Sequence, residues 1–263
     1  TAALRGSGAL SFGNIIGSNL ANIGLIVGLT AMLRPLRVQA IVVRRELPMM
    51  LLATAVAFVF ALDSALSEGA AASYGRGDGV VLLLLLTVFV HYTIMEILRQ
   101  RESGSREVGL APASWSVRKS VVVGTAGLVA LVVGAQLTVE GAVGIARAAG
   151  ISEAVIGLTL VAIGTSLPEL AASLVAAWRG QAGIAIGNVI GSNLFNLLLV
   201  LGVTATIWPI PVPDGGIIDL TALSILSVLL LVVCATPGRR IIRAEGALLL
   251  AIYLAYLSGR ALL

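Results

Sequence analysis

GNVIGSNLFNLLLVLGVTATIWPI, residues 187–210, is an apolar stretch long enough to cross a membrane, and it carries glycine, serine and asparagine at regular places. An earlier stretch, GNIIGSNLANIGLIVGLTAMLRPL at 13–36, matches it at 13 of 24 positions with an offset of 174 residues. Two unrelated apolar helices share leucine and alanine by chance, but not a G-N-x-x-G-S-N-x-x-N frame, because polar residues in membrane spans are rare. The two stretches are therefore an internal repeat.

The composition of the whole chain indicates a membrane protein. Of the 263 residues, 58% are hydrophobic and 11% are charged, whereas a soluble domain carries about 25% charged residues. This composition excludes a water-soluble domain and a disordered chain. The single cysteine excludes a disulfide framework and a cysteine-based zinc site. The net charge of +4 indicates loops that face anionic lipid, with no nucleic-acid partner.

Continuous apolar runs divide the chain into candidate transmembrane helices. They are too long, and alternate too little, to be strands of a membrane barrel. We expect an all-α polytopic membrane protein, with one polar linker at 99–119 between two halves. The eight expected spans are about 8–33, 47–67, 79–98, 120–146, 152–178, 182–208, 217–236 and 242–262.

Basic residues divide unevenly between the two sides of this arrangement. The loops on one side hold 13 of the 17 Lys and Arg residues, and those on the other side hold 4. By the positive-inside rule the first side, which includes the 99–119 linker, is cytoplasmic, and both termini of the chain lie outside the cytoplasm. Because five helices separate the starts of the two copies, the copies have opposite orientations. Inverted repeats with interrupted helices are typical of secondary transporters.

A second motif, GTSLPE at 164–169, lies in the helix before the second copy. Subtracting the repeat offset from 169 gives −5, so an equivalent motif of the first half would precede residue 1. We therefore expect roughly two helices of the first half, about 20 residues each plus turns, to be missing from this sequence. Residues 1–98 are then the remainder of a first inverted repeat, and residues 120–263 are the second.

Polar residues in the GTSLPE helix follow one stripe at i, i+3, i+4 and i+7. Pro168 has no N–H, so the carbonyl of Gly164 loses its intrahelical donor and the helix is expected to break in mid-span. Freed carbonyls are costly in lipid unless they line a cavity or bind a cation. The stripe comprises Ala162, Thr165, Ser166 and Glu169.

The repeated motif adds further oxygens. Ser192 and Asn196 stand at i, i+4, and Ser18 and Asn22 repeat this spacing. Small-xxx-small faces accompany them in both copies and are expected to let backbones approach closely. These faces are formed by Gly13 with Gly17 and by Gly187 with Gly191.

Hydroxyl, amide, carboxylate and carbonyl oxygens are the ligands of hard cations, and calcium takes six to eight of them. Neither His nor Cys lies near these motifs to suit zinc or copper. A carboxylate inside a membrane is costly and is usually functional, which favours Glu169 as a ligand. The serines and asparagines also fit a second interpretation, in which they hydrogen-bond between helices.

Other polar residues have simpler interpretations. Glu140 lies within a span and serves packing or pathway electrostatics, whereas Asp63 and Glu96 can reach the headgroups. His91 is expected to be a packing residue and Cys234 a core residue. The basic loop 34–45 is expected to determine topology, with lipid binding as the alternative.

At these motifs the sequence resembles the cation/calcium exchanger superfamily, in particular its prokaryotic sodium/calcium exchanger branch. The resemblance covers nearly the whole chain, as helices three to ten of a ten-helix fold that consists of two inverted five-helix halves. Eight of the ten helices are then present, and the first two are lacking. The family's ion ligands correspond to Ser18, Asn22, the Ala162 carbonyl, Thr165, Ser166, Glu169, Ser192 and Asn196.

Two departures from the family pattern are visible. The GTSLPE helix of the first half, with its second glutamate, is not in this sequence, and many exchangers carry Asp where this chain has Asn196. The resemblance implies a calcium/sodium antiporter of the cell's inner (plasma) membrane that works by alternating access. Such a protein is not an enzyme and needs no cofactor, and its partners are the two ions and the bilayer.

Three alternatives remain at this stage. A proton/calcium antiporter typically has an acid closing its G-N-x-x-E motif, where this chain has Gly17 and Gly191. A truncated relative that only assembles or regulates would transport nothing. A channel is disfavoured, because an inverted repeat with a closed oxygen cage suits alternating access better than an open pore.

Overall fold

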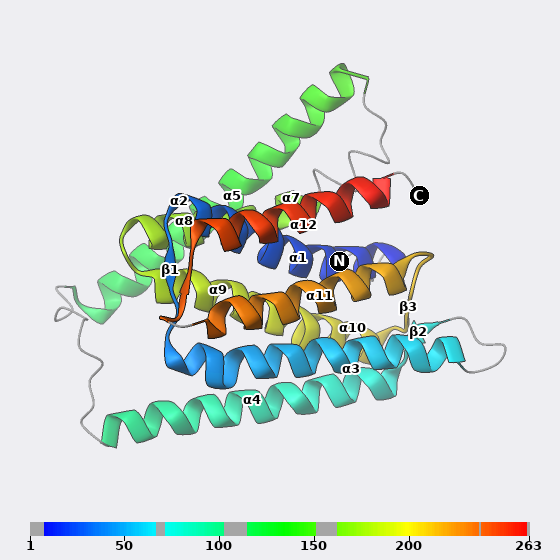
Figure 1. The fold of residues 1–263 in the computed structure, drawn as a ribbon, viewed down its shortest axis with the longest axis horizontal. Helices are drawn as coiled ribbons and strands as arrows, with labels where there is room; N and C mark the ends of the chain where they lie inside the picture. Colours follow the sequence, from blue (N-terminus) through cyan, green and yellow to red (C-terminus); the bar gives the residue numbers. More distant parts are fainter. Residues whose placement is uncertain (1–7, 67–71, 103–114, 151–161, 237, 262–263) are drawn as a thin grey trace.

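A computed structural model describes residues 8–66, 72–102, 115–150, 162–236 and 238–261 (Figure 1). These residues form a bundle of helices with two very short strand ladders, which confirms the all-α fold. The buried side chains are mostly Leu, Ile, Val and Ala, and many large apolar side chains elsewhere are exposed. Exposed apolar surface on this scale fits a bundle surrounded by lipid.

The two copies of the repeat form matching interrupted helices. The first comprises α1 (Gly8–Ala21), a π-helical turn η2 (Asn22–Val27) and α2 (Gly28–Leu33). The second comprises α9 (Ala182–Leu194), a π-helical turn η5 (Phe195–Val200) and α10 (Leu201–Ile207). π-helical turns are rare and are frequently found at functional sites. Their occurrence at the same place in both copies marks this region as the candidate site.

Other elements surround these two. The helices are η3 (Val42–Glu46), α3 (Leu47–Leu66), α4 (Arg76–Glu102), α5 (Val117–Ala148), α7 (Ala162–Thr165), α8 (Leu167–Trp178), α11 (Gly216–Ala235) and α12 (Arg243–Ala261). The strands are β1 (Leu36–Arg37), β2 (Ser73–Tyr74), β3 (Ile210–Pro211) and β4 (Arg240–Ile241).

Six helical segments of the described chain are long and apolar enough to cross a membrane. Most of the expected 152–178 span either lies outside the described residues or forms two short helices, α7 and α8. The expected span at 242–262 corresponds to α12, which has charged residues at both ends and is not among the six. The expected number of eight spans thus stays a prediction.

The two ladders show how the halves are related. Strand β1 pairs with β4, and β2 pairs with β3, so each ladder joins one strand from each half. Strand β1, which follows the first copy, contacts the start of the second copy at α9, and β3, which follows the second copy, contacts α1. The two copies therefore run antiparallel through the bundle, which confirms the inverted repeat.

The last helix of each half also packs against the repeated helix of the other half. Helix α12 packs along α2, and α4 packs along α10. A Cβ on Gly28 would lie 2.9 Å from the Gly246 carbonyl oxygen, and one on Gly79 would lie 2.6 Å from the Gly202 carbonyl oxygen. Gly28 and Gly202 are equivalent positions of the repeat. Glycine at both crossings lets the backbones approach closely.

The structure corrects the expectation of close approach at three of the four motif glycines, Gly13, Gly187 and Gly191. A Cβ on Gly13, Gly187 or Gly191 would meet no described atom within 4 Å. The close contacts at Gly28 and Gly202 lie further along each copy, beyond the π-helical turn, because the last helix of the other half crosses there.

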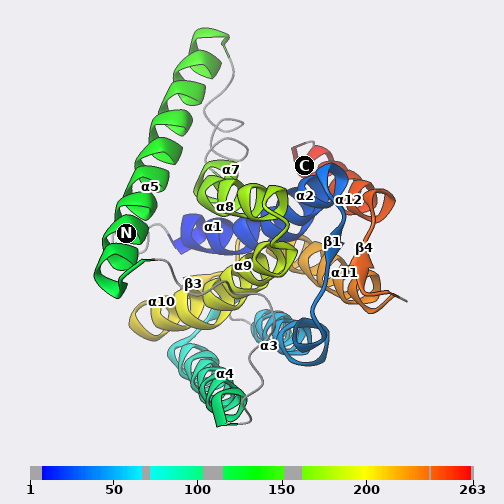
Figure 2. The same ribbon diagram turned by 90° about the vertical axis from the view of Figure 1, so that its left-hand side faces the viewer.

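Helix α5 differs from the rest of the bundle. Nearly all of its side chains are exposed, and Figure 2 shows it at the periphery. Its described contacts are chiefly with α7 and α8, and one of them sets Val139 against Gly164. Helix α5 is therefore the least tightly packed of the long helices described.

Adding a side chain at either glycine crossing should destabilise the fold. Gly28→Leu and Gly202→Leu force backbones apart, and overpacking of this kind costs about 1–3 kcal/mol. We expect both variants to unfold at a lower temperature than the parent in detergent. Gly124→Leu, in α5 where a Cβ meets nothing within 4 Å, is the control and should unfold near the parent. Equal losses in all three variants would contradict the assignment of these crossings.

Candidate ion-binding site

The site begins at a break in the GTSLPE segment. Helix α7 ends at Thr165, Ser166 has non-helical angles (φ −99°, ψ 3°), and α8 starts at Leu167 with Pro168 in its first turn. This confirms the break that the sequence predicts. The Gly164 carbonyl lacks an N–H at Pro168 to accept from, so backbone oxygen is left for another partner. Helix α7 packs on α1, and α8 packs on α9 and η2, so the break faces the repeated motif.

Two predicted residues from opposite halves meet at this break. The Ser18 and Thr165 hydroxyls are 3.1 Å apart and share a hydrogen bond. Ser18 is buried, whereas Thr165 is exposed. Ser166 is buried within the bundle. A pair of hydroxyls in contact places two candidate oxygen ligands side by side.

Glu169 provides the carboxylate. Its side chain is half-buried, and its Oε2 atom is buried with no hydrogen-bond partner among the described residues. Asn188 donates to the Glu169 backbone carbonyl (3.3 Å) and to the Ser173 hydroxyl (3.1 Å), which fixes α8 against α9. A buried carboxylate oxygen without a donor is unusual in proteins and suits a bound cation.

The two asparagines predicted as ligands are held by reciprocal bonds between the copies. The Asn22 amide nitrogen donates to Asn193 Oδ1 (2.9 Å), and the Asn196 amide nitrogen donates to Asn19 Oδ1 (3.3 Å). Asn22 is equivalent to Asn196 in the repeat, and Asn19 to Asn193. The two bonds are therefore equivalent: the same interaction occurs twice, once with the donor in each copy.

These bonds determine which atom each asparagine has left over. Because the N–H group of Asn22 is engaged, its Oδ1 remains as an acceptor. That oxygen is buried, and nothing in the described part of the chain donates to it. It is the second unpartnered oxygen at this site, after Glu169 Oε2. An oxygen-rich site of this kind suits a hard cation.

Asn19 and Asn193 are the partners of the predicted ligand amides, and the sequence analysis did not single them out. Both are almost fully buried, and Asn193 also donates to the Asn19 backbone carbonyl (3.4 Å). The sequence does contain a signal for them, because Asn19 and Asn193 are the same residue type at equivalent positions of the repeat. The prediction considered only the i, i+4 pairs, and helix spacing does not show which neighbours meet across an interface.

Two predicted ligands remain, Ala162 and Ser192. Ala162 begins α7, and Ser192 is half-buried in α9. No hydrogen bond among the described residues joins Ser192 to the others. No group of three His, Cys, Asp or Glu side chains able to hold a metal occurs in the described part of the chain. Apart from Glu169, this site therefore offers neutral oxygens.

The residues given simpler interpretations can also be placed. Cys234 is fully buried and unpaired, which confirms it as a core residue. His91 is exposed with its ring edge against Tyr92. Glu140 is exposed and accepts from Gln136 (3.1 Å), and Glu96 is half-buried. The side chain of Asp63 lies outside the described set.

An inverted repeat, a helix broken in mid-span and a cluster of oxygen ligands between the copies define a class of protein. It is a polytopic membrane carrier of the secondary-transporter type. Comparison with known proteins identifies the family. The family model described as sodium/calcium exchanger protein matches residues 1–95 and 119–261, so the chain belongs to the sodium/calcium exchanger family.

Individual relatives cover nearly all of the chain. The putative antiporter CaxA of Alkalimonas amylolytica is 37% identical over 97% of this chain and 80% of its own length. The sodium/calcium exchanger MaX1 of Methanosarcina acetivorans is 31% identical over 97% of this chain and 81% of its own. A solved structure of the sodium-calcium exchanger NCX_Mj, soaked with Na⁺ and Sr²⁺, superposes with a TM-score of 0.78 at 36% identity. That match covers 98% of this chain and 79% of the other.

Removing an acceptor of the reciprocal bonds should weaken the fold. Asn193→Leu leaves the buried N–H group of Asn22 without a partner, which costs about 1–3 kcal/mol. We expect a lower unfolding temperature in detergent. Asn193→Asp keeps the Oδ1 acceptor but removes the donor to the Asn19 carbonyl and buries a carboxylate, so it should also unfold at a lower temperature than the parent.

Thr221→Val is a matched control, because the exposed Thr221 hydroxyl donates only within its own helix, to the Ile217 carbonyl (2.7 Å). It should leave the unfolding temperature nearly unchanged. A neutral effect of Asn193→Leu would show that the bond to Asn22 does not hold the copies together.

Proposed function

We propose that this protein exchanges calcium for sodium across the membrane by alternating access, with Glu169 as the acidic ligand. The observation that carries the proposal is the buried, unpartnered Glu169 Oε2 beside the proline break. Family membership supports both ions as the cargo. Calcium and sodium both prefer oxygen ligands, so the two can compete for overlapping sites. We expect no covalent chemistry and no cofactor.

The ligand set supports this competition. Ser18, Thr165 and Asn22 contribute neutral oxygens, and Glu169 contributes one negative charge. Asn196 provides an amide where many exchangers have a carboxylate, and it is already a donor to Asn19. A site with few charges holds a divalent ion less tightly than a site with several acids, and an ion that is to be transported must also be released.

The packing supports a division into rigid and moving parts. The asparagine bonds tie the two copies to each other, and the glycine crossings tie each copy to the last helix of the other half, whereas α5 is peripheral and largely exposed. Sliding of α5 along α7 and α8 would disturb few side chains. We assign to α5 the movement that opens the site alternately to each side.

For the cellular setting, we propose the plasma membrane of the cell, the inner membrane where there are two. The 99–119 linker then faces the cytoplasm, and both termini of the chain lie outside it. The loops at the β1·β4 end support this orientation, because they carry an excess of arginine.

Neutralising the acidic ligand should abolish transport. We expect Glu169→Gln to reduce sodium-gradient-driven uptake of radioactive calcium into proteoliposomes to background, because the site loses the carboxylate that carries the unpartnered oxygen. Glu140→Gln is the matched control, since Glu140 also lies in an apolar helix but is exposed, and it should keep parent uptake. The full-length protein is used in both cases.

The outcomes distinguish the alternatives. Calcium uptake that ignores sodium and follows a pH gradient would establish a proton/calcium antiporter. Uptake driven by neither gradient would establish a relative that does not transport calcium. Sodium-driven uptake that survives in Glu169→Gln would remove Glu169 from the site.

Removing a hydroxyl of the Ser18–Thr165 pair should weaken calcium affinity without changing the maximal transport rate. Ser18→Ala removes one oxygen, and a lost bond of about 0.5–1.5 kcal/mol predicts a roughly 2- to 10-fold rise in the calcium concentration for half-maximal uptake. The maximal rate should stay near that of the parent. Ser224→Ala is the control, because its hydroxyl donates to Leu220 of its own helix (2.8 Å). A fall in maximal rate at unchanged half-saturation would exclude Ser18 as a ligand.

A further inference from the structure

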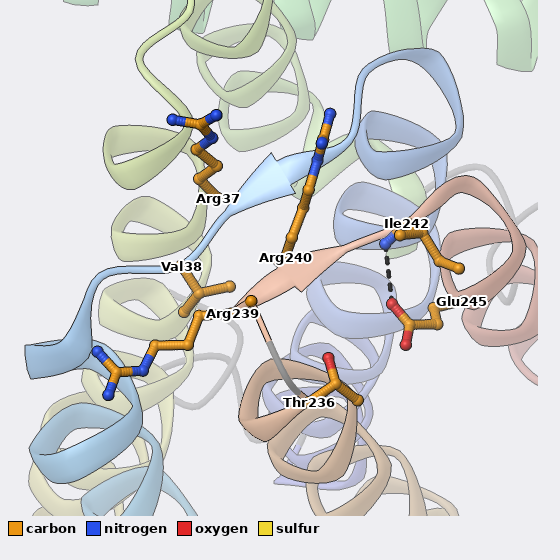
Figure 3. A pocket seen from close by; sticks show the side chains of 8 residues that line it. Arg37, Val38, Thr236, Arg239, Arg240, Ile242 and Glu245 are labelled. Carbon is orange, nitrogen blue, oxygen red and sulfur yellow. Dashed lines mark hydrogen bonds between the residues drawn. The ribbon is translucent and has the colours of Figure 1, made fainter.

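The ladder between β1 and β4 places two arginines directly opposite each other. Arg37 and Arg240 are Cα partners in the antiparallel register, and both side chains are exposed. Figure 3 shows the two guanidinium groups extending to the same side of the ladder, with Arg239 on the other side. Like charges directly opposite in a ladder repel each other. An anion between them would turn this repulsion into attraction.

A cavity of about 910 Å³ opens at this ladder. Its polar lining includes Arg37, Arg239, Arg240, Thr236 and Glu245 (Figure 3). The lining thus carries three positive charges and one negative charge. The volume is large enough for a phosphate group and the atoms attached to it.

Nothing in the described part of the chain neutralises these arginines. None of the three forms a salt bridge there, whereas Arg260 at the far end of α12 pairs with Asp219 (2.7 Å). The one acid in the lining is engaged elsewhere, since Glu245 Oε2 accepts the Ile242 backbone N–H (2.8 Å) at the start of α12. The positive charge at the ladder is therefore available to a ligand.

The turn that presents these arginines is held in place. Arg239 has φ +43°, an uncommon value for a residue with a side chain, and it follows Gly238 at φ +91°. The Arg239 carbonyl accepts the Val38 backbone N–H (2.7 Å), which ties this turn to β1. A strained backbone conformation that the surroundings hold in place is common at ligand sites.

The surroundings of the cavity indicate the kind of anion. Strand β1 begins three residues after α2, and β4 ends two residues before α12, so the ladder lies where helices leave the apolar layer. Leu33 and Ile242 beside it are each 49% exposed. A guanidinium group can bind two phosphate oxygens at once through parallel hydrogen bonds. Basic pockets between helices at the cytoplasmic face bind lipid headgroups.

We propose that Arg37 and Arg240 form a binding site for a phosphate group, supplied by the headgroup of an anionic phospholipid whose acyl chains lie along Leu33 and Ile242. A phosphate held by both guanidinium groups connects β1 to β4. It thereby joins the end of α2 in one half to the start of α12 in the other. The site is separate from the ion ligands, and the proposal does not depend on the transported ion.

The test measures lipid binding to the full-length protein in a neutral detergent. Phosphatidylglycerol and phosphatidylcholine are titrated separately, with the unfolding temperature and native mass spectrometry as readouts. We expect phosphatidylglycerol to bind the parent at least about tenfold more tightly than phosphatidylcholine. Arg37→Gln/Arg240→Gln should lose this preference, because it removes charge-assisted hydrogen bonds to phosphate.

Arg44→Gln/Arg179→Gln is the matched control, because it removes two exposed charges, one in η3 and one at the end of α8, from outside the cavity lining. It should keep the preference to within about twofold, since exposed charges act weakly at a distance in salt. Arg37→Lys/Arg240→Lys keeps both charges without the paired geometry and should lose several-fold in affinity. This lysine variant preserves the test if the glutamine variant does not fold.

Inorganic phosphate distinguishes the two sources of the ligand. If it neither stabilises the parent nor displaces phosphatidylglycerol, the headgroup is the ligand. If it does both, and the glutamine variant loses both effects, the site stands with free phosphate as its ligand. A parent without lipid preference, or a control variant that loses as much as the Arg37/Arg240 variants, would overturn the proposal.

Discussion

The reciprocal asparagine bonds are the interaction on which this structure depends. In an apolar environment an amide that lacks a partner is costly, so three buried amides and the half-buried Asn196 at the centre of a membrane bundle must satisfy one another or bind something. Asn22, Asn193 and Asn196 donate to acceptors on the other copy, whereas the Asn19 amide nitrogen has no acceptor among the described residues. The Asn22 Oδ1 acceptor has no donor among the described residues, and a bound ion can use this oxygen as a ligand.

The glycine crossings follow from the same inversion. Because the copies run antiparallel, each half can place its last helix against the other's interrupted helix, and a small residue is needed wherever backbones cross closely. Gly28 and Gly202 occupy equivalent positions and meet Gly246 and Gly79. The described bundle thus has a rigid centre that both halves build jointly. Helix α5, which has few such contacts, is the element best able to move.

Charge is distributed in keeping with this arrangement. Among the described residues at the centre, the Glu169 carboxylate stands beside neutral oxygens and has an oxygen without a donor. A bound cation can therefore contact this oxygen without breaking an internal hydrogen bond. At one end of the bundle, arginines gather on the β1·β4 ladder without a salt bridge to any described acid, and there we propose that they bind anionic lipid. At the far end of α12, Arg260 is satisfied within the protein by Asp219.

The sequence by itself determined the class, the inversion and the helix break. Long apolar runs indicate the membrane, a repeat at an offset of 174 residues indicates the symmetry, and Pro168 removes an N–H from the middle of an apolar run, so each of these follows from the local sequence. Only the tertiary structure decided that Asn19 and Asn193 hold the ligand amides, that backbones cross at Gly28 and Gly202, and that Arg37 faces Arg240. Those facts depend on which faces of distant segments meet. Periodicity along one helix cannot report them, since it shows which residues share a face but not what lies opposite that face.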